Sequence, residues 1–84
     1  MTYKIVYSKE ASKALRHMPK NTALTILRKI EALALSPYAK NNNIKELKGL
    51  EGFRLRVGDW RILYQIHNNI LQIYIVTIAP RGGA

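Results

Sequence analysis

Three arginines, Arg54, Arg56 and Arg61, have the spacing needed to share one face of a β-hairpin. Apolar residues alternate with them on both sides of Gly58-Asp59, which is typical of a two-residue turn. Such a turn places Arg56 opposite Arg61 and Arg54 opposite Leu63. A planar guanidinium that keeps its charge can hold a phosphate and stabilise the charge that grows during phosphoryl transfer. We therefore predict a phosphate site on this face.

A solvated basic surface is the alternative interpretation of these arginines, because antiparallel sheets often leave one face exposed to water. Asp59 could also neutralise one of the three. Like charges directly opposed on a sheet destabilise it, however, and a merely solvated face has no need of three guanidinium groups. The phosphate site is therefore the interpretation we favour.

The other polar residues do not suggest a second catalytic site. His17 and His67 have no further ligands at metal-binding spacing, so we expect neither a metal nor another cofactor. Ser8 lacks a partnered histidine and base, and it is better placed as a helix N-cap. The acidic residues form no convincing carboxylate pair for acid-base catalysis. Gly82-Gly83 follows Arg81 with no helix behind it, so it does not resemble a phosphate-binding loop.

The composition indicates one small domain over residues 1–84. The chain carries 14 Lys+Arg against 5 Asp+Glu, a net charge of +9, and its 48% hydrophobic content is enough for a core. This charge predicts a polyanionic partner, which could be nucleic acid, anionic lipid or an acidic protein. The absence of cysteine excludes disulfides and thiolate metal sites. Without a recognisable signal peptide or membrane span, we expect a cytoplasmic protein with no membrane partner.

The first half of the chain predicts one strand followed by an antiparallel helical hairpin. Residues 3–7 are rich in the aromatic and β-branched types that favour strands. Ser8 can cap a first helix, which Pro19 ends, and a second amphipathic helix then runs to Ser36-Pro37. The polar stretch 38–44 predicts a loop.

The second half predicts a three-stranded antiparallel meander. The hairpin around Gly58-Asp59 supplies two strands, and residues 70–78 supply the third after a turn at Asn68-Asn69. If that turn has two residues, Tyr74 joins the arginines and Leu71 joins the core. We predict an α+β fold, in which the first strand joins the meander in an antiparallel sheet and both helices pack on one face.

These features together resemble the RelE/ParE toxin superfamily over essentially the whole chain. The specific part is residues 47–64, LKGLEGFRLRVGDWRILY, whereas the helical half is generic. Resemblance to the RelE branch implies a RelE-like fold and the toxin of a type II toxin–antitoxin system. It implies a ribosome-dependent endoribonuclease, or mRNA interferase, that inhibits translation by cutting mRNA in the ribosomal A site. It also implies an acidic, RelB-like antitoxin as a partner, besides mRNA and ribosomal RNA.

The resemblance also implies a reaction and residues for it. In such ribonucleases the ribose 2′-hydroxyl attacks the adjacent phosphate without a metal and leaves a cyclic phosphate and a free 5′-hydroxyl. The family's basic residues on the middle strands match Arg54, Arg56 and Arg61, and the basic residue after its last strand matches Arg81. These four arginines are therefore expected to bind the scissile phosphate and stabilise its transition state.

The sequence departs from the family pattern at two points. Arginines stand where some RelE toxins have lysines on the second strand, and the tyrosine that commonly follows the terminal arginine is missing from a sequence that ends at Ala84. The missing tyrosine is expected to reduce activity. Without that tyrosine, the general base is unassigned. Lys48 or Lys45 is the best candidate, if nearby arginines favour its neutral form, and Tyr74 is a weaker candidate. Lys45 and Tyr74 are also expected to bind substrate.

Two other functions are compatible with the same fold. A ParE-like toxin inhibits DNA gyrase by binding it as a protein and cuts no RNA. The arginine cluster favours the RelE branch, because a gyrase binder has no need of a phosphate clamp. The second alternative is a catalytically weak member that acts with its antitoxin as a transcriptional co-repressor, and the sequence does not separate this from a weak nuclease.

Overall fold

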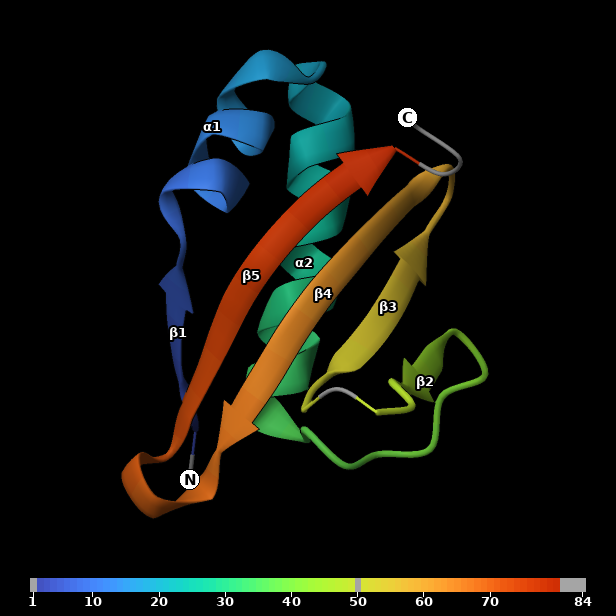
Figure 1. The fold of residues 1–84 in the computed structure, drawn as a ribbon. Coiled ribbons are helices and arrows are strands. Elements are labelled where there is room, and N and C mark those ends of the chain that lie inside the picture. The colour runs from blue at the N-terminus through green and yellow to red at the C-terminus, as the bar shows by residue number, and fades with distance from the viewer. Residues whose placement is uncertain (1, 50, 81–84) are drawn as a thin grey trace.

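The computed structural model describes residues 2–49 and 51–80, which form two helices and five strands. The first half contains β1 (Lys4–Tyr7), α1 (Lys9–His17) and α2 (Lys20–Leu35). The second half contains β2 (Ile44–Glu46), β3 (Phe53–Val57), β4 (Trp60–His67), the short 3₁₀ helix η1 (Asn68–Ile70) and β5 (Gln72–Pro80). Both helices lie behind one face of the sheet, and α2 returns along it (Figure 1). The predicted α+β class is confirmed.

The sheet is mixed, with strand order β1-β5-β4-β3-β2. β1 pairs with β5 in parallel, so that Lys4 lies beside Gln72 and Tyr7 beside Ile75. A parallel pair requires a long crossover connection. Along the chain, the two helices and the other three strands connect β1 to β5. The expected antiparallel pairing is therefore wrong for the first strand, while the meander of β3, β4 and β5 is antiparallel as predicted.

The stretch that we expected to be a loop ends in a short strand. Ile44 begins β2, which pairs antiparallel with β3 and places Lys45 opposite Arg54. The chain then returns close against β4. A Cβ atom built on Gly52 would lie 2.9 Å from the carbonyl oxygen of Tyr64, and Gly52 has a φ of +140°. Only glycine accepts both conditions, so Gly52 allows the backbone before β3 to approach β4 closely.

Ser8 joins the start of α1 to the sheet. Its hydroxyl accepts a hydrogen bond from the Ala11 backbone N–H at 3.0 Å, as expected of an N-cap. The same hydroxyl donates to the Val76 carbonyl on β5 at 2.7 Å. α2 ends at Leu35, directly before Ser36-Pro37, as predicted. The start of α1 is therefore anchored to β5 at a defined position.

The core lies between α2, α1 and the inner face of the sheet. Among the predicted inner residues of the hairpin, Leu55, Ile62 and Tyr64 have 2%, 0% and 1% exposure, and the partly buried Phe53 and Trp60 pack against this core. Leu71 is an exception to the predicted core, since it is 36% exposed. It follows η1 with a left-handed φ of 49°, one residue before β5 begins, and therefore does not enter the sheet.

Candidate functional site on the arginine face

The register of the β3–β4 hairpin is the predicted one. Val57 pairs with Trp60, Arg56 with Arg61 and Arg54 with Leu63. The three arginines therefore lie on the outer face of the sheet, away from the helices, and we call this surface the arginine face. Directly opposed residues in an antiparallel pair have Cβ atoms about 4.5–5.5 Å apart. A single phosphate can therefore contact more than one guanidinium group here.

The guanidinium groups have hydrogen-bond donors to spare. Arg56 is exposed, whereas Arg54 and Arg61 are half-buried. The Arg61 Nε is fully buried and lacks a hydrogen-bond partner in the described part of the chain. None of the side-chain hydrogen bonds among the described residues involves an arginine. A buried donor without a partner is uncommon and costs stability in the free protein, whereas an exposed guanidinium group such as that of Arg56 can donate to an anionic ligand.

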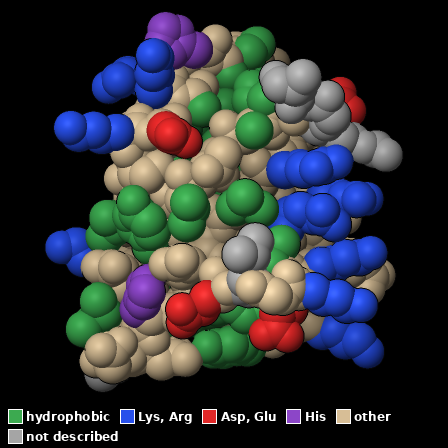
Figure 2. All heavy atoms as spheres, in the orientation of Figure 1, with side chains coloured by type: hydrophobic (Ala, Val, Ile, Leu, Met, Phe, Trp, Pro, Cys, Tyr) green, Lys and Arg blue, Asp and Glu red, His purple; other side chains and the backbone are tan. Residues whose placement is uncertain are grey.

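The two candidate lysines extend this basic surface. Lys45 lies opposite Arg54 on β2, so it shares the arginine face, and Lys48 is exposed in the turn that follows β2. Figure 2 shows lysine and arginine side chains along the margin of the sheet where β3 and β2 lie, beside an apolar centre. Arg81 lies outside the described residues. The last described residues of β5 lie beside β4, where Ala79 pairs with Arg61 and Pro80 with Trp60.

Tyr74 is on the arginine face but is not close to the arginines. It pairs with Gln65 on β4, as expected for a turn with an even number of residues. Gln65 is four positions from Arg61 along β4, which corresponds to about 13 Å. The structure therefore brings together Arg54, Arg56, Arg61 and Lys45, and it leaves Tyr74 at a distance.

A hollow of about 240 Å³ is lined by residues of β3, β4 and the C-terminal part of β5, together with the turn after β2. Arg54 and Arg61 line it, together with Leu47, Leu63 and Thr77. Sequence reasoning missed Leu47 and Thr77. Thr77 lies opposite Leu63 because β5 has an extra residue at this point, since Leu63 pairs with Thr77 whereas Tyr64 pairs with Ile75. No local sequence pattern predicts this β-bulge.

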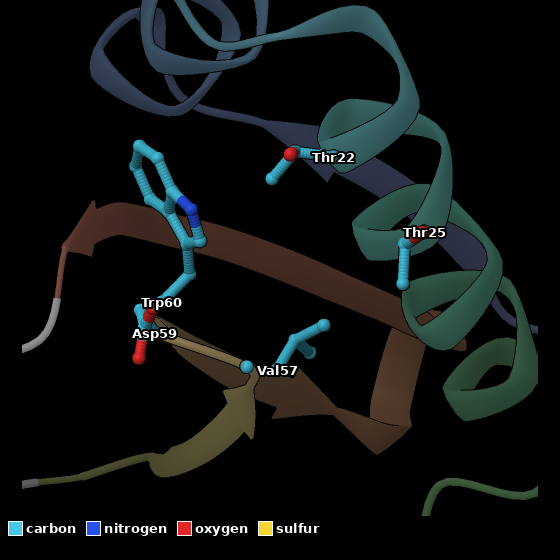
Figure 3. A pocket seen from close by; sticks show the side chains of 6 residues that line it. Thr22, Thr25, Val57, Asp59 and Trp60 are labelled. Carbon is cyan, nitrogen blue, oxygen red and sulfur yellow. The ribbon is translucent and has the colours of Figure 1, made fainter.

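A second hollow, also of about 240 Å³, lies on the helix side of the hairpin turn. Figure 3 shows Val57 and Trp60 from the hairpin on one side and Thr22 and Thr25 from α2 on the other. Asp59 is the one ionisable residue in its lining, so the hollow has no cation to hold a phosphate. It suits contact with a protein better than contact with a nucleic acid.

Tyr64 lies under the arginine cluster but faces the opposite way, into the core. Its hydroxyl is buried and lacks a hydrogen-bond partner among the described residues. Burial raises the pKa of Tyr64 to about 12, because the charged phenolate would lose its hydration. Tyr64 therefore remains protonated near neutral pH and does not supply a base to the outer face.

Two further classes of feature are absent from the described residues, 2–49 and 51–80. Within them, no three histidine, aspartate or glutamate side chains gather closely enough to hold a metal ion. Neither described helix combines the length and the apolar character that crossing a membrane requires.

Comparison with known proteins places the chain in a family. Residues 5–83 match the family described as ParE toxin of type II toxin-antitoxin system, parDE. A chain of the archaeal RelE-RelB complex from Pyrococcus horikoshii OT3 is 30% identical, with a TM-score of 0.85 over 100% of both chains. A chain of the RelB-RelE antitoxin-toxin complex from Methanococcus jannaschii is 25% identical, with a TM-score of 0.73 over 92% of this chain and 91% of that one.

A third structure shares the fold at low identity. The YoeB/ParE toxin from Agrobacterium tumefaciens is 14% identical, with a TM-score of 0.79 over 93% of this chain and 98% of that one. No curated protein matches the sequence significantly.

Proposed function

The chain belongs to the RelE/ParE superfamily of type II toxin–antitoxin toxins, and from this premise we propose that it is a ribosome-dependent endoribonuclease that cleaves mRNA in the A site. One observation carries the proposal. Arg56 and Arg61 are directly opposed on an open face of the sheet, with Arg54 beside them. This arrangement costs stability in the free protein and becomes favourable when a phosphate lies between the guanidinium groups.

In the proposed reaction, the 2′-oxygen of one nucleotide attacks the phosphorus that links it to the next nucleotide. The O2′–P bond forms and the P–O5′ bond breaks, which leaves a 2′,3′-cyclic phosphate and a 5′-hydroxyl. One proton leaves O2′ and one reaches O5′, so the step balances without another reactant. Negative charge increases on the phosphate in between, and Arg54, Arg56 and Arg61 would donate hydrogen bonds to it. Arg81 would join them.

The proton transfers need a group that can release and accept a proton near the scissile phosphate. Arginine stays protonated near neutral pH and does not meet this need. Lys45 lies opposite Arg54 on the same face, and Lys48 lies two residues after the end of β2. We therefore propose these two lysines as the candidates for the proton-transfer group. Separate replacement of each lysine by methionine would identify which of them carries the proton.

We also propose an acidic, RelB-like antitoxin as the partner of this toxin, in the cytoplasm where mRNA is translated. The archaeal structure from Pyrococcus horikoshii is a RelE-RelB complex, and the net charge of +9 favours an acidic segment here. Binding should weaken as salt rises, because ions screen the attraction. Salt-independent binding in a titration would contradict this part of the proposal.

A ParE-like activity is the second candidate, because the matching family is described as ParE toxin. A toxin of this kind would bind DNA gyrase as a protein, and the hollow that contains Trp60 offers a surface without cations for such a contact. The arginine face has no evident use in that mechanism. We therefore rank the ribonuclease first.

Translation in vitro with toeprinting of a defined message tests the two candidates together. Cleavage at codon positions, only when ribosomes are present, supports the ribonuclease. Gyrase-dependent DNA breaks without cleavage of the message would support the ParE-like function and overturn our proposal. Absence of both activities would also overturn it and would favour a co-repressor that acts only with its antitoxin.

A further inference from the structure

The hollow beside Arg54 and Arg61 has an apolar part that phosphate binding does not explain. Its lining contains two cationic residues, Arg54 and Arg61, together with Thr77 and four apolar residues, Leu47, Leu63, Ala79 and Pro80. A phosphate offers polar oxygens in every direction and gains nothing from leucine. The combination fits a ligand that is anionic at one end and apolar and flat at the other.

The fold holds Leu47 in this position. The Leu47 N–H donates to the Gly52 carbonyl at 3.0 Å, which closes the turn between β2 and β3. The Leu47 Cδ1 atom lies 3.8 Å from the place where a Cβ on Gly52 would be, and that place is 2.9 Å from the Tyr64 carbonyl oxygen. The turn is therefore closed tightly against β4, which places Leu47 beside Leu63 in the lining of the hollow.

A neighbouring hollow shows by contrast why the arginines matter. It has a volume of about 270 Å³ and shares Leu47 and Leu63, but Glu51, Gln65 and Val76 replace the arginines in its lining. The carboxylate of Glu51 would repel a phosphate. The hollow that contains Arg54 and Arg61 is thus the one suited to a nucleotide.

We propose that this hollow binds the base of a nucleotide adjoining the scissile phosphate, with Leu47 and Leu63 in contact with the base and Thr77 at its edge. This inference rests on the proposed ribonuclease function and adds a base subsite to it. Single-stranded RNA is recognised through unstacked bases that pack on apolar side chains or guanidinium planes. Pockets for drug-sized ligands measure about 300–1,000 Å³, so about 240 Å³ suits one base.

The test uses single-turnover cleavage on ribosomes programmed with synthetic messages. Each position of the A-site codon is replaced in turn by an abasic ribonucleotide, which keeps the ribose and its 2′-hydroxyl. Contact of one base with the leucine side chains buries apolar surface, so we expect loss of that base to raise the half-saturating toxin concentration roughly tenfold at one position. We expect Leu63→Thr and Leu47→Thr to raise that concentration similarly on the intact message and to abolish the abasic effect.

Val6→Thr is the matched control, because Val6 is also half-buried on the arginine face but lies on β1 beside Tyr74. It should leave both measurements unchanged, and melting curves identify any variant that fails to fold. Thr77→Val keeps the side-chain shape and should reduce the preference among bases at the affected position.

Two results would overturn the base subsite in different ways. If the unmodified message is cleaved but the leucine variants keep the full abasic effect, the subsite is wrong and the ribonuclease stands. If the original protein cleaves no message at all, the proposed function fails and the subsite fails with it.

Discussion

The two faces of the β3–β4 hairpin are formed by alternating residues of the same strands, and yet they differ in their contribution to the stability of the fold. On the inner face Leu55 lies opposite Ile62, and both are almost fully buried. On the outer face Arg56 lies opposite Arg61. Burial of the first pair stabilises the fold, whereas opposition of the second pair costs stability. Because one register determines both pairs, the core holds the arginines together against their repulsion.

This difference separates residues that stabilise the protein from residues expected to act on a substrate. Inner residues should affect unfolding and leave chemistry intact in the molecules that remain folded. Outer arginines should affect cleavage and leave the fold intact. Neighbours in the sequence, such as Arg61 and Ile62, provide the sharpest comparison, since they lie side by side on the same strand and belong to opposite faces of the sheet.

The largest effect on stability is expected from Ile62→Ala. Ile62 has 0% exposure at the centre of the sheet, so the variant loses buried surface and leaves a cavity. We expect the free energy of unfolding to fall by about 2–5 kcal/mol in urea denaturation. Leu63→Ala, one residue along on the outer face, should cost clearly less. Equal losses for the two variants would contradict the division between the faces.

Arg61→Ala should reduce cleavage of a ribosome-bound message by about 100–1,000-fold, or about 3–4 kcal/mol in the barrier. Its guanidinium would otherwise stabilise charge that increases on the phosphate. Stability should not fall, because the change relieves repulsion from Arg56 and removes a buried Nε without a partner. Single-turnover cleavage and a melting curve on the same sample check both statements.

Arg28→Ala is the matched control for Arg61→Ala, since Arg28 is an exposed arginine on α2. It removes the same charge from the molecule without touching the arginine face. Cleavage by the Arg61 variant at the parental rate, or loss of activity only through unfolding, would show that the arginine face is a solvated surface.

The inner face also predicts a pH dependence. The pKa of Tyr64 is raised to about 12 by burial, against about 10 for an exposed tyrosine in the unfolded chain. The stability linked to this proton is complete below pH 10 and is lost as the pH rises from 10 toward 12. Denaturation at pH 9 and pH 11 should therefore show a loss of about 1 kcal/mol that Tyr64→Phe does not show.

The stability of Tyr64→Phe at neutral pH tests whether the Tyr64 hydroxyl contributes to folding. The Tyr64 hydroxyl has no hydrogen-bond partner within the described chain, so its removal should not lower the stability. An alkaline loss of the same size in both proteins would assign the effect to other groups, such as the lysines.

The smallest effect is expected from Arg56→Gln. Arg56 is exposed and lies opposite Arg61, so removal of its charge should raise the free energy of unfolding by about 0.2–1 kcal/mol. The gain should shrink as salt increases, because exposed charges are screened. Arg28→Gln should give no comparable gain. A stabilisation that does not change with salt would argue against repulsion as its cause.

The arginine face could be predicted from the sequence because it depends on local rules. Alternation with a period of two assigns each hairpin residue to a face, and Gly58-Asp59 sets the register of the pair. Gly58 adopts the left-handed φ of 57° that such a turn requires. The positions of Arg54, Arg56 and Arg61 followed from these facts alone.

Other parts of the site depend on segments that are distant in sequence. Tyr74 reached the expected face, although η1 makes the turn longer than the two residues assumed and excludes Leu71 from the core. Local patterns did not predict the bulge that turns Thr77 outward, nor the closed turn that places Leu47 beside Leu63.

The sequence by itself therefore determined which arginines share the outer face of the hairpin, and the tertiary structure decided what surrounds them. Periodicity is a property of a few consecutive residues, so it can be recognised along the chain. Strand order, the parallel pairing of β1 with β5 and the approach of Gly52 to Tyr64 arise only when separate elements pack together. The hollow beside Arg54 and Arg61 is bounded by residues from four segments, which are the turn after β2 and the strands β3, β4 and β5, and for this reason it becomes visible only in the folded molecule.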